Sequence, residues 1–356
     1  MVYNFNAGPG ILPPAVLEQA SQAVLDFNGS GFSLLEIGHR EAPFVAVMEE
    51  ARALVKELMQ LQSNREVLFL QGGATMQFMQ VPMNLLGEDG VAAYTDTGTW
   101  SSKAIKEAKV FGHVDVVASE KENGYTSMPA SVPCSDTSAY LHITTNETIA
   151  GTQWQQIPYQ QQVPLVADMS SDVFSRQLDF NRFGLIYAGA QKNTGPAGVT
   201  MVVVDPDILG KVQRNIPSIL DYRLHIKEGS MLNTPPVFAV YVVLLTLRWL
   251  KNEGGVQVME QRNQQKSDLL YNTIASIPMF HLPVAPHSRS KMNVVFTMKD
   301  PELEKRFMQQ CKDAGIVGIK GHRSVGGFRA SLYNALPLSH VQVLVDVLRD
   351  FAQKNG

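Results

Sequence analysis

Lys192 lies in a segment that combines a nucleophile with small neighbours. The segment, residues 188–198, reads AGAQKNTGPAG, and apolar runs at residues 183–187 and 199–204 flank it. Such runs predict two buried strands joined by a turn. A lysine amine that is desolvated in this setting can act as a nucleophile and then as a base. We hypothesise that Lys192 forms a Schiff base with a planar carbonyl compound, for which the small residues leave room.

A carboxylate and an aromatic ring follow two other predicted strands. Asp168 ends the run VPLVAD, and Trp100, in DTGTWSS, ends a predicted loop at residues 95–100. A buried carboxylate needs a partner, which the protonated ring nitrogen of pyridoxal phosphate would supply. The indole could stack on the same ring. The ordinary alternatives are a structural carboxylate that caps the next segment and a core or surface tryptophan.

The turn GGAT places Ala74 and Thr75 at the start of a predicted helix. The free N–H groups and the dipole of a helix N-terminus favour a phosphate. The alternative is a strand-to-helix turn with Thr75 as its cap. Thr148, in TTNETIAG, offers a hydroxyl for a ring substituent, although a turn threonine is an equally simple explanation. Together with Lys192, these features favour pyridoxal phosphate as the cofactor.

Basic residues occur in two groups, His39-Arg40 and the segment GHRSVGGFRAS, which holds His322, Arg323 and Arg329. Arginine grips a carboxylate or a phosphate through two parallel hydrogen bonds. The two groups would therefore suit a substrate with two anionic ends. A surface ion-pair network is the alternative for any one of them.

The elements that must position these residues alternate between strand and helix. Strand patterns at residues 67–70, 91–94, 114–117, 140–144 and 164–167 are separated by helical ones. This alternation predicts an α/β fold with a mostly parallel sheet covered on both faces. Ligands of such sheets bind at the carboxyl ends of the strands. Because Asp168, Thr148 and Trp100 all follow predicted strands, we expect them to meet in one crevice.

A second unit follows Gly254-Gly255, which ends a long apolar helix. The patterns predict helices at residues 256–277 and 302–314, strands at residues 293–298, 316–319 and 328–333, and a closing helix. A chain of 356 residues is also long for a single core. We expect residues 15–254 to form a large cofactor-binding domain. Residues 1–14 and 255–356 are expected to form a small domain.

Composition excludes several functions. The net charge of −3 argues against nucleic-acid binding. No GxGxxG, GxxxxGK, HExxH or CxxC motif occurs, and Cys134 and Cys311 have no metal-binding spacing, so no metal is expected. We expect no signal peptide and no membrane segment, because the longest apolar run, residues 237–250, is shorter than the roughly 20 residues that span a bilayer. A reduced, cytoplasmic location follows as the expectation.

The chain resembles the phosphoserine aminotransferases, which are class V aminotransferases with pyridoxal-phosphate fold type I. The resemblance extends over nearly the whole length, through NFNAGP, GHR, GGATMQF, TGTWS, TNETI, ADMSS, IYAGAQKNTGPAG, LNTPP and GHRSVGGFRASLYNA. It implies a large domain with a mostly parallel seven-stranded sheet and a smaller α/β C-terminal domain.

The resemblance also implies roles for the residues. Lys192 would carry the Schiff base, Asp168 would pair with the ring nitrogen, Trp100 would stack on the ring and Thr148 would contact the ring hydroxyl. The cofactor phosphate would be held by Ala74, Thr75 and Gln191, together with Asn233 and Thr234 of the other subunit. A homodimer with shared active sites is therefore expected.

Substrate binding is implied in the same way. Arg329 would hold the α-carboxylate. His39 and Arg40, with His322 and Arg323 of the other subunit, would bind the distal phosphate or the side-chain carboxylate of glutamate.

The implied reaction moves an amino group between L-glutamate and 3-phosphohydroxypyruvate, giving 3-phospho-L-serine and 2-oxoglutarate in L-serine biosynthesis. The sequence leaves open whether 4-phosphohydroxy-L-threonine of pyridoxine biosynthesis is also a substrate. The alternatives are another class V aminotransferase such as the alanine–glyoxylate type, a cysteine desulfurase, or a non-catalytic pyridoxal-phosphate-binding protein. The two His-Arg pairs favour the phosphorylated substrate, because the alanine–glyoxylate reaction needs no second anion site.

Overall fold

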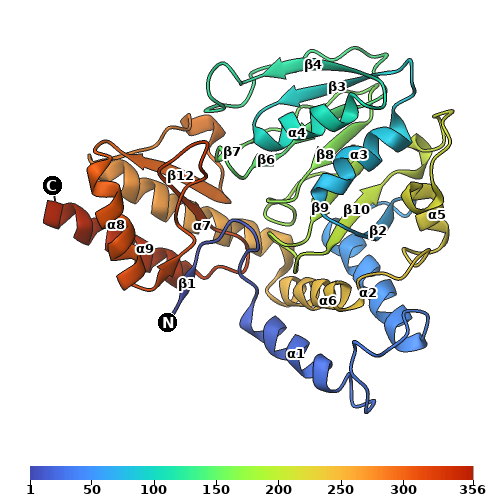
Figure 1. Ribbon diagram of the computed structural model, residues 1–356, viewed down its shortest axis with the longest axis horizontal. Coiled ribbons are helices and arrows are strands. Elements are labelled where there is room, and N and C mark those ends of the chain that lie inside the picture. Colours follow the sequence, from blue (N-terminus) through green and yellow to red (C-terminus); the bar gives the residue numbers. More distant parts are fainter. Residues whose placement is uncertain (356) are drawn as a thin grey trace.

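A seven-stranded sheet forms the centre of the protein (Figure 1). The computed structural model describes residues 1–355. The strands lie in the order β2 (Glu66–Gln71), β10 (Val199–Val204), β9 (Leu185–Gly189), β8 (Leu165–Asp168), β5 (Leu141–Thr144), β3 (Val91–Asp96), β4 (His113–Ser119). Only β10 is antiparallel to its neighbours. The prediction of a mostly parallel seven-stranded sheet is confirmed.

Helices cover both faces of this sheet because alternate strand residues feed two separate cores. On β2, Val67 and Phe69 face one core, whereas Leu68 and Leu70 face the other. The first core contains α1 (Pro14–Leu25), α2 (Ala42–Leu58) and α6 (Val237–Asn252), and the second contains α3 (Ala74–Leu85), α4 (Thr99–Ala108) and α5 (Tyr222–Lys227). Strands buried on both faces need continuous apolar sequence, which explains why these strands could be predicted from apolar runs.

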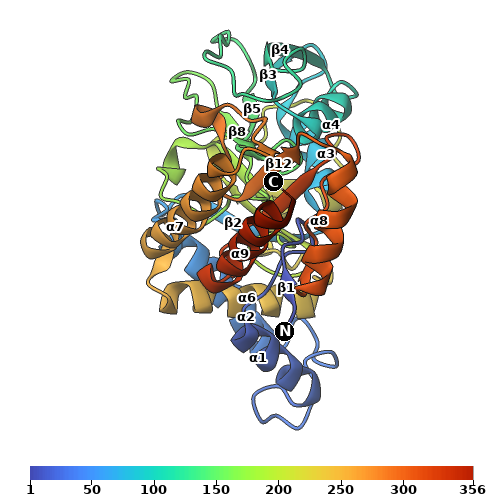
Figure 2. The same ribbon diagram turned by 90° about the vertical axis from the view of Figure 1, so that its left-hand side faces the viewer.

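The C-terminal part has its own core. A three-stranded sheet in the order β11 (Phe280–His281), β12 (Asn293–Met298), β14 (Phe328–Ser331) packs against three helices. These are α7 (Gly255–Ser276), α8 (Glu302–Asp313) and α9 (Leu338–Asn355), which lie side by side in Figure 2. Edge-to-face phenylalanine contacts, such as Phe296 with Phe307 and Phe307 with Phe351, fill the interior.

The N-terminal segment joins this C-terminal core. Strand β1 (Tyr3–Asn4) pairs in parallel with β13 (Ile316–Val317), and Phe5 is fully buried among C-terminal residues. We predicted a longer strand at residues 316–319, but β13 stops at Val317. Gly318 has a φ of +77°, and a Cβ there would lie 2.3 Å from the Asn6 side chain. The close approach of the N-terminal segment thus ends the strand.

Gly254 separates the two parts of the chain. Its φ of 100° is left-handed, a conformation that glycine adopts without strain, and it turns the chain from α6 into α7. The remaining regular elements are β6 (Asn146–Glu147), β7 (Thr152–Gln153) and the 3-10 turns Phe180–Arg182, Pro206–Ile208, Ser218–Leu220 and Pro286–Ser288. Within residues 1–355, no helix combines the length and apolar character needed to cross a bilayer.

Phe5→Ala should destabilise the protein, because Phe5 links the N-terminus to the C-terminal core. Truncating a fully buried phenylalanine costs about 3–5 kcal/mol of unfolding free energy. Denaturant unfolding measures this loss. The matched control, Val2→Ala at an exposed neighbouring position, should change it by less than about 0.5 kcal/mol. Equal effects of the two substitutions would contradict the assignment of Phe5 to that core.

Candidate active site

Six strands of the large sheet are mutually parallel, and five of them bring site residues to the edge where their carboxyl ends lie. Four of them lead directly into site residues: β2 into the α3 turn, β3 into α4, β5 into residues 145–148 and β9 into Lys192. The last residue of the fifth strand, β8, is Asp168. The crevice expected from the sequence is therefore present, and the sheet topology explains why residues distant in sequence meet there.

Lys192 points to Thr148 and Trp100. Its Nζ donates a hydrogen bond to Thr148 Oγ1 at 2.6 Å and lies 5.0 Å from the centre of the Trp100 ring. Burial lowers the pKa of the amine, and the positive charge of Arg329 acts in the same direction, while Asp168 and Glu147 oppose the shift. A lowered pKa raises the fraction of neutral, nucleophilic amine.

Small residues around Lys192 also serve close packing. A Cβ on Gly195 would lie 2.6 Å from Cγ2 of Val243 in α6, and a Cβ on Gly189 would lie 3.3 Å from the backbone nitrogen of Ala74. Both glycines let the turn approach its neighbouring helices. The sequence interpretation that they only make room for a ring is therefore incomplete.

Asp168 is held by a serine that the sequence analysis did not identify. Asp168 Oδ1 accepts hydrogen bonds from Ser170 N at 2.9 Å and Ser170 Oγ at 2.6 Å, and the Gly189 N–H donates to Ser170 Oγ. Burial raises the pKa of the Asp168 carboxyl, whereas the Lys192 charge lowers it. In the described part of the chain, no hydrogen bond engages Oδ2, which leaves this atom for a ring N–H. In the sequence, Ser170 in the segment ADMSS was the signal that could have indicated this contact.

Trp100 lies in the first turn of α4 rather than in the predicted loop. Buried Glu147 caps this helix, because its oxygens accept the N–H groups of Trp100 at 3.3 Å and Ser101 at 3.1 Å. Gly98 leaves space for the carboxyl group: a Cβ there would be 2.4 Å from Glu147 Cδ. Burial raises the pKa of Glu147 to about 7. The sequence analysis missed Glu147, although an acidic residue directly before Thr148 was a usable signal.

The N-terminus of α3 is open for an anion. Its N-cap is Gly73, no side chain caps the helix, and Thr75 is exposed. The alternative in which Thr75 caps the helix is therefore wrong. Gln191, which was assigned to the same phosphate, is half-buried, and its carbonyl accepts the Gly10 N–H at 2.7 Å. Free N–H groups and the helix dipole make this turn suitable for a phosphate.

Arg329 reaches the same crevice from β14. Its Nη1 donates to the Thr148 carbonyl at 3.2 Å, and its buried Nε has no acceptor. Burial lowers the pKa of this guanidinium, and within residues 1–355 no carboxylate forms an ion pair with it. A half-buried arginine with a buried, unmet donor is suited to bind an anion.

The other basic residues fall into two sets. Burial lowers the pKa of His322, and the positive charges of Arg329, Arg323 and Lys103 lower it further. His322 therefore lies near Arg329. His39 and Arg40 lie in the α1–α2 loop, just before α2 begins. Over the described residues, no hydrogen bond or ion pair joins them to the crevice.

Asn233 and Thr234 lie in the loop before α6, where Thr234 is exposed and its carbonyl accepts a hydrogen bond from the Gln71 side chain.

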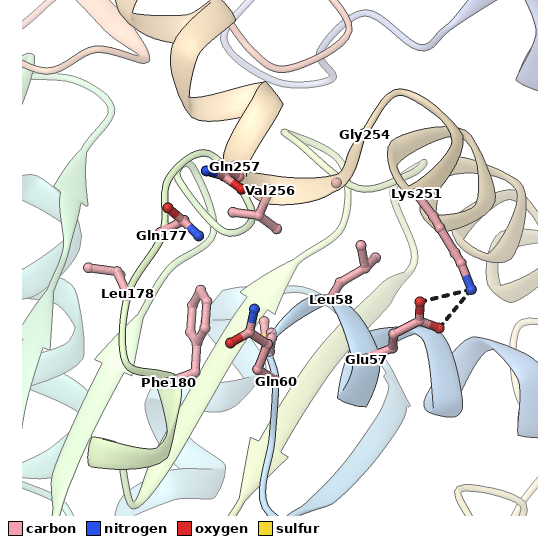
Figure 3. A pocket seen from close by; sticks show the side chains of 12 residues that line it. Glu57, Leu58, Gln60, Gln177, Leu178, Phe180, Lys251, Gly254, Val256 and Gln257 are labelled. Carbon is pink, nitrogen blue, oxygen red and sulfur yellow. Dashed lines mark hydrogen bonds and ion pairs between the residues drawn. The ribbon is translucent and has the colours of Figure 1, made fainter.

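A separate cavity of 420 Å³ lies between α2, the α6–α7 junction and residues 177–180 (Figure 3). Its one lysine, Lys251, already pairs with Glu57 at 2.8 Å. None of the predicted site residues lines it, so it is distinct from the crevice.

The carboxyl edge of this sheet brings together a buried lysine amine, an aspartate with a free oxygen, an indole ring and an uncapped helix N-terminus. This combination defines an enzyme that uses pyridoxal phosphate. The chain belongs to the class V aminotransferases: the model of that family, Aminotransferase class-V, matches residues 2–344. The predicted fold type I and the predicted cofactor are thereby confirmed.

Individual relatives agree with this assignment. The chain is 55% identical to the phosphoserine aminotransferase of Flavobacterium johnsoniae over 99% of each chain. Its structure is similar to that of the phosphoserine aminotransferase from Bacillus circulans subsp. alkalophilus, with a TM-score of 0.97, 44% identity and coverage of 100% and 99% of the two chains. The pyridoxal-phosphate-bound enzyme from Trichomonas vaginalis matches with a TM-score of 0.90, 36% identity and coverage of 98% and 100%.

Glu147→Gln should remove a pH dependence of stability. Folded Glu147 stays protonated up to about pH 7, whereas the unfolded carboxyl ionises near 4.5, so the folded state loses stability as the pH rises through this window. The stability of the wild type relative to Glu147→Gln should therefore fall by about 3 kcal/mol across it.

Denaturant unfolding of the cofactor-free proteins at several pH values measures this difference. Glu88→Gln, at an exposed position, is the matched control and should follow the wild type. A constant difference between the wild type and Glu147→Gln would contradict the raised pKa.

Proposed function

We propose that the chain transfers the amino group between L-glutamate and 3-phosphohydroxypyruvate in L-serine biosynthesis. The observation that carries this proposal is Arg329, a half-buried arginine whose buried Nε has no acceptor, next to Lys192, with His322 and Arg323 nearby. The arrangement supports binding of a substrate with one carboxylate and a second anionic group. The phosphoserine aminotransferase relatives support the same substrate pair.

The residues of the crevice fit the chemistry of pyridoxal phosphate. Lys192 Nζ would bind its carbonyl carbon, Asp168 Oδ2 its ring nitrogen and Trp100 its ring face. The N-terminus of α3, at Ala74 and Thr75, would hold the phosphate together with Gln191. When bound, the cofactor supplies an electron sink for the substrate Cα–H bond.

The protein residues then have separate tasks. Lys192 removes and returns the proton at the substrate Cα, and its lowered pKa leaves part of the amine neutral for this role. Thr148 Oγ1 holds the Nζ atom in place. Asp168, fixed by Ser170, keeps a negative charge opposite the ring nitrogen. Arg329 orients the substrate through its α-carboxylate, and His322 and Arg323 bind its distal anion.

Part of the site comes from a second copy of the chain in this proposal. The resemblance took His322 and Arg323 from the other subunit, but His322 lies near Arg329 of its own chain, so this proposal takes His39 and Arg40 from the other subunit instead. They would complete the partner's distal anion site, and Asn233 and Thr234 would reach the partner's cofactor phosphate. Two observations support a homodimer. Among residues 1–355, no hydrogen bond or ion pair joins His39 or Arg40 to the crevice, and the same α1–α2 loop exposes the large apolar side chains of Phe32 and Leu35, at 62% and 61%. Exposed apolar side chains of this size favour a protein partner.

The same proposal includes domain limits and a location. Residues 15–254 would form the large domain, and residues 1–14 and 255–356 the small one; the β1–β13 pairing supports the placement of the N-terminus. A cytoplasmic location agrees with the free state of Cys134 and Cys311.

Substrate choice is the direct test of this function. With L-glutamate as the amino donor, kcat/KM for 3-phosphohydroxypyruvate should exceed that for pyruvate or glyoxylate by at least about 10³-fold, since a site built to pair with an anion rejects analogues that lack it. Arg323→Ala should lower kcat/KM for 3-phosphohydroxypyruvate and so bring it closer to the values for pyruvate and glyoxylate. Comparable kcat/KM values for glyoxylate and the phosphorylated acceptor would favour the alanine–glyoxylate type, and bound cofactor without turnover would favour a carrier.

Mixing two defective variants tests the shared site. Lys192→Ala and Arg40→Ala should each be strongly impaired alone. After co-expression or subunit exchange, about half of the dimers are mixed and each has one intact site, so activity should recover to about a quarter of the wild-type value. Activity no greater than the sum of the two parents would show that Arg40 serves its own subunit. Mixing Lys192→Ala with Arg329→Ala is the control: both residues serve the site of their own subunit, so no intact site forms and no activity should be recovered.

A further inference from the structure

Five buried asparagines connect the large sheet to the C-terminal core around the active site. Each is less than one-tenth exposed, and together they form the asparagine network, which consists of Asn146, Asn193, Asn263, Asn293 and Asn334. A buried amide is costly unless its donors and acceptors are bonded. The hydrogen-bond partners of these five side chains therefore indicate which segments the network holds together.

The first connection starts next to Lys192. Asn193 Nδ2 donates to the Val173 carbonyl at 2.5 Å, and Asn193 Oδ1 accepts the backbone N–H of Asn334 at 2.9 Å. Asn334 Nδ2 in turn donates to the Phe174 carbonyl at 3.0 Å. The turn that carries Lys192 is thus joined directly to the segment that follows β14.

Helix α7 holds the same segment from the other side. Asn263 Nδ2 donates to Asn334 Oδ1 at 2.8 Å and to the Ser175 carbonyl at 2.9 Å. Lys266, one turn further along α7, is 2% exposed, and its Nζ donates to the carbonyls of Leu332 and Tyr333, both at 2.8 Å. Residues 332–334 are therefore fixed by both parts of the chain.

A second connection starts next to Thr148. Asn146 Nδ2 donates to Asn293 Oδ1 at 2.8 Å, and Asn293 Nδ2 donates to Ser331 Oγ at 3.0 Å. Ser331 is the last residue of β14 and lies two residues after Arg329. The asparagine network therefore joins both neighbours of the Lys192 amine, its own turn and the Thr148 segment, to the strand that carries Arg329.

This strand needs such support. On one side β14 pairs with β12, and on the other the Arg329 N–H donates to the Ile319 carbonyl and Phe328 bridges to Lys320. All of these partners belong to the C-terminal part of the chain, so backbone pairing alone does not determine where Arg329 lies relative to the large sheet. Asparagine offers both a donor and an acceptor without charge. An aspartate at position 193 would place another negative charge beside Lys192 and raise its pKa. Neutral amides therefore suit this position.

We propose that the asparagine network, together with Lys266, sets the position of the Arg329 guanidinium relative to the Lys192 amine. Asn263, Lys266 and Asn334 are then positioning residues for the substrate α-carboxylate, although none of them touches the substrate. The inference rests on the proposed function, in which Arg329 binds that carboxylate.

Two ligands separate this role from a structural one. O-Phospho-L-serine and O-phosphoethanolamine share the amine and the phosphate, but only the first has a carboxylate. Absorbance titration of the cofactor-loaded enzyme gives a Kd for each. Asn263→Ala and Lys266→Met should weaken phosphoserine binding about tenfold and change phosphoethanolamine binding by less than about twofold, since only carboxylate contact is disturbed.

Ser267→Ala is the matched control, because this buried serine on α7 bonds only within its own helix, to the Gln264 carbonyl at 3.0 Å. It should leave both Kd values unchanged. Lys266→Met keeps a long apolar side chain in place, so it tests the inference if Asn263→Ala does not fold. Thermal unfolding of each variant measures its structural damage separately.

Arg329→Ala is the reference, and it should lose phosphoserine affinity selectively. If it does, but the network variants weaken both ligands equally or neither, the positioning role is wrong and the proposed function stands. If Arg329→Ala itself does not distinguish the ligands, the carboxylate assignment fails and the inference fails with it.

Discussion

The site depends on the burial of one amine beside carboxylates that only partly compensate for its lost hydration. Burial lowers the pKa of Lys192, and Asp168 and Glu147 pull it back up. A pKa that stayed high would leave the amine fully charged, and a fully charged amine is no nucleophile. Without the carboxylates the charged amine would be an isolated buried charge, which is costly. The surrounding hydrogen bonds, from Lys192 to Thr148 and from Ser170 to Asp168, hold these groups at fixed positions.

Sheet topology brings these groups together. Five parallel strands end at one edge, so a phosphate turn, an indole ring, an aspartate and a lysine arrive there from separate βα units. Arg329 is the exception, since it comes from a second core with its own small sheet. The crevice therefore lies between two independently packed bodies, and its geometry depends on polar contacts across that boundary as well as on each core.

Much of the fold was predictable because apolar runs of four to six residues mark buried strands, and periodic apolar positions mark the helices. The strand at residues 199–204 matches β10 at both ends, and the helix expected at residues 256–277 matches α7 within one residue. The strand after Gly315 was predicted too long, because the contact of Gly318 with Asn6 is non-local. Trp100 was placed in a loop because its capping residue, Glu147, lies 47 positions away.

The sequence by itself determined the class of fold, the cofactor lysine and the residue types around it. These follow from local composition and from motifs such as AGAQKNTGPAG, which the resemblance reinforced. Only the tertiary structure decided which polar groups pair: Ser170 with Asp168, Glu147 with the α4 N-terminus, and the asparagine network with β14. The physical reason is that a hydrogen-bond partner is fixed by three-dimensional proximity, and most of these partners are dozens to more than a hundred residues apart, where no local pattern connects them.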